Sequence, residues 1–209
     1  GEPAAKPDTK RVDLSQSQGT EQDSSILSWQ QPGELLAINN SLKGLVVDLG
    51  DASSAATLSM ELDGRLKISG ANILDLIFKA PTDTLVISGG GGVDSLLFDM
   101  GSLSAMDLGA TDLVIEAETI ELGATQSLKG TGDFVFRGFA QISQSRTQAQ
   151  YDLTLQADAR VSLLGAVVTS GQVILDARVQ ALGGLSGNAS AVDLSLHAAT
   201  SAIAMVGGQ

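Results

Sequence analysis

A glycine run that ends in an aspartate is the first feature of this sequence that could do chemistry. Residues 89–97 read GGGGVDSLL, which matches the nonapeptide G-G-x-G-x-D-x-U-x of calcium-binding repeats. Such repeats work in tandem, because each calcium ion takes about six to eight oxygen ligands from neighbouring turns. This sequence has a single copy. The alternative prediction is a flexible glycine corner, with Val93 and Leu96 packing inward.

Four aspartates form a second candidate site, because they recur at one position of a repeated phrase. They are Asp112, Asp133, Asp152 and Asp193. If copies of the phrase stack, the first three carboxylates lie in adjacent copies and repel one another, so their charge must be compensated. The simpler interpretation is that each aspartate accepts a backbone N–H of its own turn. The alternative is a divalent cation that bridges two carboxylates.

Candidates for catalysis are few. His197 is the only histidine, and it lies on the outward side of a predicted strand. There is no cysteine, no G-x-S-x-G motif and no phosphate-binding loop. Four charged residues could form a cross-strand patch of the kind used by polysaccharide-cleaving β-helices: Asp158, Arg160, Asp176 and Arg178. Ion pairing at the surface explains them more simply. We therefore expect no enzyme activity and no cofactor, with calcium as the one candidate ion.

The composition favours short strands over helices. Apolar residues make up 43% of the chain but aromatic residues only 3%, so a core must be built from Leu, Ile, Val and Ala. The 24 glycines and 4 prolines suit many short strands joined by tight turns.

The charge excludes several kinds of partner. A net charge of -12 repels phosphate backbones and anionic lipid headgroups, which argues against nucleic-acid binding and membrane-surface binding. No apolar run approaches the roughly 18 residues of a membrane span, so we expect no direct membrane insertion. The chain starts at Gly1 without an export signal, and we expect it to be a piece of a longer protein whose signal or anchor lies elsewhere.

The repeated phrase itself predicts the fold. It consists of two aliphatic or aromatic residues spaced two apart, followed two positions later by a small residue. Eight copies begin at residues 47, 66, 85, 113, 134, 153, 173 and 194, in steps of 19, 19, 28, 21, 19, 20 and 21. A period near 20 with strand-type alternation is typical of a solenoid, in which stacked units bury one continuous core.

We therefore predict an all-β protein, a parallel β-helix of about eight coils of roughly 20 residues. The first two positions of the phrase, such as Leu113 and Ile115, would form two interior columns, with Phe134 and Leu153 next in the first. An antiparallel sandwich is the alternative, because its strands recur every 8 to 12 residues or so.

The division into domains follows from where polar residues give way to alternating aliphatic residues along the chain. Residues 1–30 are polar and predicted to be a flexible leader or linker. Residues 31–209 form the solenoid domain. The single long step predicts an insertion near residues 91–110, either a loop or hairpin that leaves the rod or a small irregular coil that uses Leu96 and Phe98.

The phrases DLVIEAETIELGA, DLTLQADARVSLLGA and GQVILDARVQALGG resemble the repeats of large secreted bacterial β-helix proteins. The similar groups are the filamentous-haemagglutinin-type adhesins and the LEPR-XLL-type surface proteins. The resemblance covers residues 45 to 209. It implies a right-handed parallel β-helix, export to the cell surface, and a role in adhesion or as a stalk. It carries over no catalytic residue.

These observations lead to one functional expectation and two alternatives. We expect a structural or adhesive segment of a large exported surface protein, whose partners are a glycan or protein on a host or surface and the neighbouring domains of the same chain. The alternatives are a carbohydrate-binding or carbohydrate-cleaving β-helix and a calcium-stabilised module of the RTX type. The low aromatic content argues against tight stacking of sugars.

Overall fold

All regular secondary structure in the described part of the chain is β-strand. The computed structural model describes residues 9–15, 27–28, 36–147, 150–182 and 196–205. These ranges contain no helix, so none that could cross a bilayer. The predicted all-β class is confirmed.

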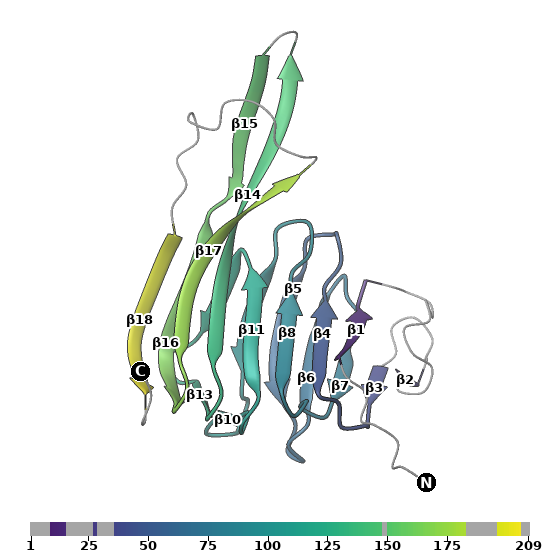
Figure 1. Cartoon of the computed structure of the whole chain (residues 1–209), viewed down its shortest axis with the longest axis vertical. Helices are drawn as coiled ribbons and strands as arrows, with labels where there is room; N and C mark the ends of the chain where they lie inside the picture. The colour runs from purple at the N-terminus through teal and green to yellow at the C-terminus, as the bar shows by residue number, and fades with distance from the viewer. Residues whose placement is uncertain (1–8, 16–26, 29–35, 148–149, 183–195, 206–209) are drawn as a thin grey trace.

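The first sheet follows the order of the chain (Figure 1). Its strands run β1-β4-β8-β11-β14, and β14 pairs further with both β15 and β17. The bounds are β1 Thr9–Asp13, β4 Gly44–Asp48, β8 Thr84–Ser88, β11 Asp112–Ala117, β14 Phe134–Thr147, β15 Gln150–Ala157 and β17 Val173–Leu182. Every pair is parallel except β14–β15, which is antiparallel.

The second sheet mixes parallel and antiparallel pairs. Its order is β10-β13-β16-β12-β9-β5-β6-β7-β3-β2, with β18 pairing to β16. The bounds are β2 Leu27–Ser28, β3 Leu36–Ile38, β5 Ala55–Met60, β6 Leu66–Ala71, β7 Leu76–Phe78, β9 Ser95–Asp99, β10 Met106–Asp107, β12 Thr119–Leu122, β13 Ser127–Gly130, β16 Ala159–Thr169 and β18 Leu196–Met205. The antiparallel pairs are β5–β6, β6–β7 and β2–β3.

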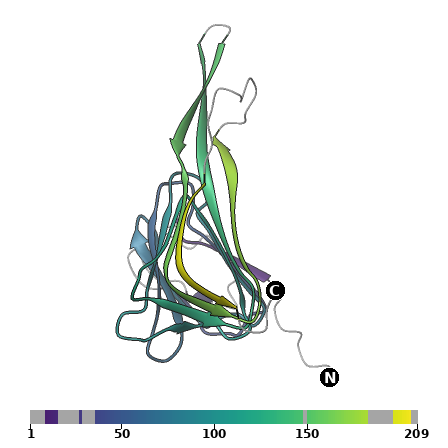
Figure 2. The same ribbon diagram turned by 90° about the vertical axis from the view of Figure 1, so that its left-hand side faces the viewer.

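The chain alternates between the two sheets. β4 leads to β5, β8 to β9, β11 to β12, β17 to β18, and β14 leads to β16 through a hairpin with β15. We call each stretch from one strand of the parallel series β1, β4, β8, β11, β14 and β17 to the next a passage. Figure 2 shows the sheets as two layers, with the β14–β15 hairpin extending beyond the body.

The core lies between the sheets and repeats from passage to passage. One inward ladder of the first sheet consists of Leu45, Leu85, Leu113, Phe134 and Val173, in parallel register. Its members are 40, 28, 21 and 39 residues apart. The outward ladder beside it is Val46, Val86, Val114, Val135 and Ile174. β-branched side chains pack well on a pleated surface, which favours strands here.

Aromatic contact joins the two sheets at the centre of the core. The rings of Phe98 on β9 and Phe136 on β14 meet edge to face, with centroids 6.4 Å apart. Both side chains are fully buried. Such a pair adds about 0.5–1.5 kcal/mol beyond the burial of its area.

Four copies of the phrase stack as predicted, namely those that begin at residues 85, 113, 134 and 173. Two others pair antiparallel, so the predicted parallel pairing is wrong for them. Leu66 lies on β6, antiparallel to β5. Leu153 lies on β15, antiparallel to β14, where it pairs with Gln144 instead of following Phe134 in a parallel ladder. The reason is that a hairpin's returning strand shows the same alternation as a parallel strand.

The two end copies also depart from the predicted phase. Val47 pairs with Ile87, so that Leu45 is the residue aligned with Leu85. Leu194 lies outside the described residues, and Leu196 on β18 pairs with Ala159 in the second sheet. The prediction of eight coils of about 20 residues is therefore wrong for the described chain.

The domain prediction also needs correction. A flexible leader does not describe residues 9–13, which form β1 against β4 because Val12 and the following Leu14 are buried in the core. The rest of residues 1–30, apart from Leu14, Ser15 and β2, lies outside the described residues. Residues 91–110 contain β9 and β10, both paired within the second sheet, and Leu96 and Phe98 are buried there. This agrees with the predicted irregular coil that uses Leu96 and Phe98, and not with a loop or hairpin that leaves the body.

Candidate functional site

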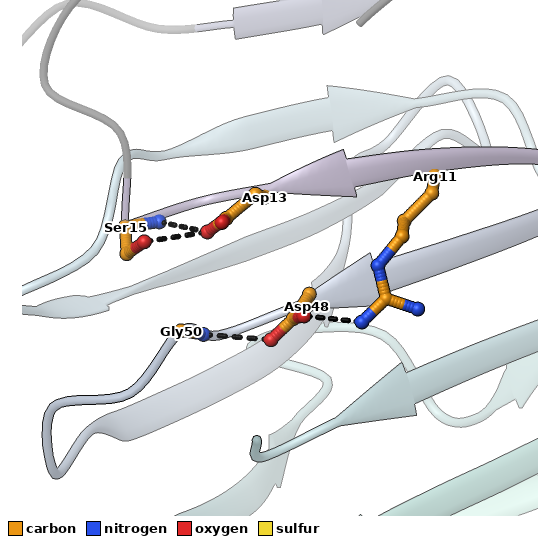
Figure 3. A network of polar contacts seen from close by, with 5 residues as sticks. All are labelled: Arg11, Asp13, Ser15, Asp48 and Gly50. Atoms are coloured by element: carbon orange, nitrogen blue, oxygen red, sulfur yellow. Dashed lines mark hydrogen bonds and ion pairs between the residues drawn. The ribbon is translucent and has the colours of Figure 1, made fainter. Parts of the chain in front are cut away.

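The turns at which the chain leaves the first-sheet strands hold a dense polar network, and we call each of these turns a corner. In the first two strands the corner is built on an aspartate (Figure 3). The Asp13 Oδ1 accepts the backbone N–H of Ser15 at 2.9 Å and its hydroxyl at 2.6 Å. The Asp48 Oδ1 accepts the N–H of Gly50 at 2.8 Å. Arg11 bonds to the other oxygen of Asp48, so the guanidinium of one strand neutralises the carboxylate of the next.

In the next passage Ser88 takes the position of the aspartate, and a run of glycines follows it. Gly90 has a φ of +73°, which L side chains rarely adopt. A Cβ on Gly90 would lie 2.3 Å from the carbonyl oxygen of Gly50. The glycine run therefore lets one corner lie directly on the backbone of the corner before it. The prediction that Val93 and Leu96 pack inward is right for Leu96, which is buried, and wrong for Val93, whose side chain is 42% exposed.

Asp94 ends the glycine corner and points inward, with 1% of its surface exposed. Its Oδ1 accepts the backbone N–H of Ser54 in the previous passage at 2.9 Å. Its own N–H donates to Oε2 of Glu118 in the following passage at 2.7 Å. Glu118 is equally buried, and its Oε1 accepts a hydrogen bond from Nε2 of Gln141 at 3.0 Å. Gln141 also donates to the carbonyl of Gly92. We call Asp94 and Glu118 the corner pair.

Backbone hydrogen bonds run through the same corner. Ser95 donates to the carbonyl of Ser54 at 2.9 Å, Thr119 to that of Asp94 at 3.0 Å, and Arg160 to that of Glu118 at 2.7 Å. The corner pair therefore sits within a hydrogen-bond ladder that links four passages.

The corner pair carries strong electrostatic strain. Burial raises the pKa of Asp94 to about 7, and the charges of Glu118 and Asp48 add to the effect. Burial raises the pKa of Glu118 as well, although hydrogen bonds to its carboxylate oppose the shift. Carboxyl groups with such pKa values occur at functional sites.

The recurring aspartates behave differently from either prediction. Asp112 and Asp133 do lie in adjacent strands, but each accepts an N–H from the next passage, not from its own turn. The Oδ1 of Asp112 accepts the N–H of Asp133 at 2.8 Å, and that of Asp133 accepts the N–H of Gln172 at 2.9 Å. Asp152 lies on the β15 hairpin, and Asp193 lies outside the described residues.

The structure does not bring the four residues of the predicted charged patch together on one sheet. Arg160 lies on β16 of the second sheet, whereas Asp176 and Arg178 lie on β17 of the first. Asp176 bonds instead to Arg137, at 2.9 Å from Nε to Oδ1, and Arg137 also contacts Glu116 at 3.4 Å.

Two further candidates remain separate from the corner. The backbone of His197 pairs with Arg160 on the outer strand β18. Asp158 precedes β16 and is partly buried. Neither residue takes part in the hydrogen bonds that the structure describes for Asp94 and Glu118.

No metal centre is built into the described residues. They contain no group of three or more His, Cys, Asp or Glu side chains that could hold an ion. The aspartate of the glycine run is the Asp94 just described, and its nearest acidic neighbour supplies only a second carboxylate. Calcium needs about six to eight oxygens, so the corner does not form the predicted calcium turn.

The sequence carried a signal for the corner pair that the motif search missed. Inward residues of β11 fall on odd numbers up to Ala117, and those of β12 on even numbers from Ile120. Glu118 stands in phase with the second set, as Asp94 stands in phase with Leu96. A charged residue in the inward phase predicts a buried carboxylate.

Comparison of the chain with protein-family models, with curated proteins and with solved structures finds no match.

Proposed function

We propose that this chain is a β-solenoid segment, a right-handed parallel β-helix, of a large exported bacterial surface protein. In this role it works mechanically, as a stiff stalk or adhesion module at the cell surface, without catalysis. The observation that carries the proposal is the in-register parallel order β4-β8-β11-β14-β17, with the ladder of Leu85, Leu113 and Phe134 buried beneath it.

The mechanical role follows from how such a stack resists force. Hydrogen bonds between first-sheet strands link one passage to the next, so they run along the direction in which passages accumulate. Corner bonds such as Asp112 to Asp133 add side-chain links across the same junctions. In a stacked architecture each unit contacts mainly its neighbours, so stability adds along the stack.

The acidic, aromatic-poor composition supports this role over sugar binding. A surface with net charge -12 stays soluble and keeps neighbouring rods apart. The partners under this proposal are neighbouring domains of the same chain, together with a glycan or protein on the contacted surface.

Single-molecule pulling tests the proposal. With handles at both ends, a solenoid should release one passage at a time. The ladder spacings of 40, 28, 21 and 39 residues correspond to length increments of about 14, 10, 7 and 13 nm. Release of the whole core in one step would contradict a stack of semi-independent passages.

A glycan array and a lyase assay on polyuronates test the carbohydrate alternative. The stalk proposal expects no turnover of any polyuronate. Measurable turnover would replace it with an enzymatic function.

A further inference from the structure

Among the described residues, none supplies the cation that the two adjacent buried carboxylates of the corner pair require. Within the part of the chain that the structure describes, no lysine or arginine forms an ion pair with Asp94 or Glu118. The other charged group that acts on Asp94 is Asp48, which is also acidic. Arg160 contributes its backbone N–H to Glu118, but its side chain is exposed. Two uncompensated negative charges in this position would be costly.

A metal ion does not fit beside the unsatisfied oxygen. Oδ2 of Asp94 is buried and has no hydrogen-bond partner. It faces Gly89 so closely that a Cβ on that residue would lie 2.7 Å from it. A calcium ion needs a shell of oxygens at about 2.3–2.6 Å, and the corner offers backbone carbon on this side. A proton needs no such room.

The hydrogen bonds also indicate which carboxyl group holds the proton. Both oxygens of Glu118 accept hydrogen bonds, from the N–H of Asp94 and from Nε2 of Gln141. Those bonds favour the charged form of Glu118. Asp94 has one satisfied and one unsatisfied oxygen, so its Oδ2 is the place for the proton.

We propose that the corner pair is a proton-dependent latch, in which protonated Asp94 and ionised Glu118 hold the glycine corner onto the passages on either side. When Asp94 loses its proton, the two charges repel across the corner. The hydrogen bonds from Ser54 to Asp94 and from Asp94 to Glu118 then have to hold the corner against the repulsion between the two carboxylates. The stack is therefore tightest in mildly acidic medium and loosens at this corner in alkaline medium.

The sign of the pH dependence follows from linkage. The pKa of Asp94 is about 7 in the folded chain and near 3.8 in the unfolded chain. Between these values the folded state binds a proton that the unfolded state has lost. The stabilisation is fully present below pH 3.8 or so and is lost as the pH rises through about 7.

The sequence makes this dependence easy to isolate. It has one histidine and no cysteine, so His197 and the terminal amine are the main ordinary groups that titrate between about pH 6 and 9. The test compares thermal unfolding midpoints of the full chain across that range. We expect the wild-type midpoint to fall by about 3–6 °C as the pH rises across that range.

Three variants give the test its controls. Asp94→Asn keeps the shape and the acceptor for Ser54 but cannot ionise, so its midpoint should stay level. Asp51→Asn removes an exposed carboxylate beside the same corner and should keep the wild-type slope. His197→Gln should keep the slope as well. A wild-type slope in Asp94→Asn, or a level wild-type profile, would overturn the proposal.

Two measurements on the wild-type chain remain decisive if the asparagine variant does not fold. Infrared spectroscopy of the folded chain at about pH 6 should show one protonated carboxyl band that disappears by about pH 9. Calcium added at about pH 9 should not restore the midpoint, because the site takes a proton. Restoration by calcium, or absence of the band, would contradict the latch.

Discussion

Gly90→Ala would show directly whether the corners stack backbone on backbone. Gly90 combines a φ of +73° with a neighbour from the preceding passage. A Cβ there would lie 2.3 Å from the oxygen of Gly50 and 2.9 Å from Oδ1 of Asp48. The Gly50 oxygen belongs to backbone that is held on both sides, so it cannot turn away as a side chain could.

Gly101→Ala supplies the matched control. Gly101 also has a positive φ, +57°, but a Cβ there would meet nothing within 4 Å. Both variants carry the cost of a left-handed L residue, about 1–2 kcal/mol. Gly90→Ala carries in addition a steric cost of about 1–3 kcal/mol, as in overpacked cores. We therefore expect about 2–5 kcal/mol for Gly90→Ala.

Urea unfolding followed by far-ultraviolet circular dichroism measures both variants. The difference between them isolates the contact between passages, because the conformational cost is common to both. Equal midpoints for Gly90→Ala and Gly101→Ala would refute the stacked corner, and with it the tight packing from which the latch is argued.

Three further perturbations test the rest of the structure. Leu113→Ala should lower the free energy of unfolding by about 3–5 kcal/mol, because the side chain is fully buried in the ladder. Leu97→Ala should lower it by under about 1 kcal/mol, because that side chain is 43% exposed. Chemical denaturation of both variants compares the two values. Arg137→Gln should destabilise the first sheet by about 1 kcal/mol, and more at low salt, because the half-buried guanidinium lies between Glu116 and Asp176. Unfolding midpoints measured over a series of salt concentrations test this, and equal midpoints for the variant and the wild type at low salt would contradict it. Calcium and chelator should leave the midpoint at about pH 6 unchanged, since no group of three acidic or histidine ligands forms in the described chain, and a calcium-dependent rise would argue for a bound ion.

Alternation and spacing predicted the inward ladders well. The pairs that begin at Leu85, Leu113, Phe134 and Val173 share one parallel register, as a fixed phase requires. The strands of Leu85 and Leu113 are the simple cases, because each is followed by a corner from which the chain crosses to the other sheet. Local pattern and global stacking agree there.

The direction of pairing was the part that alternation could not specify. Leu66 and Ile68 are fully buried, as any inward pair would be, but they return antiparallel to β5. The decisive signal lies in the turn, where Asp63–Gly64 stands between two alternating stretches, with Gly64 at a φ of +89°. An Asp-Gly pair in that setting is a strong hairpin signal, and it outweighs a period of 20.

The sequence predicted only part of the candidate site at Asp94 and Glu118, because contacts between distant passages cannot be read from a local motif. GGGGVD marks a tight corner, and the structure places Asp94 inside it. The motif suggested calcium, however, because sequence alone could not show that Gly89 closes the space beside Oδ2. Nor could it show that Gln141, on β14 of the next passage, completes the hydrogen bonds of Glu118.

The unequal ladder spacings and the constant register have one common explanation. Members of the ladder are 40, 28, 21 and 39 residues apart, yet the strands stay aligned. The added residues form two hairpins, β5–β6 in the second sheet and β14–β15 in the first. The corners, in contrast, remain short and bonded to each other. A loop tolerates extra length at little free-energy cost, but a corner that rests on its neighbour does not. Constraint is therefore concentrated at the corners, and the latch that we propose for Asp94 and Glu118 lies at one of them.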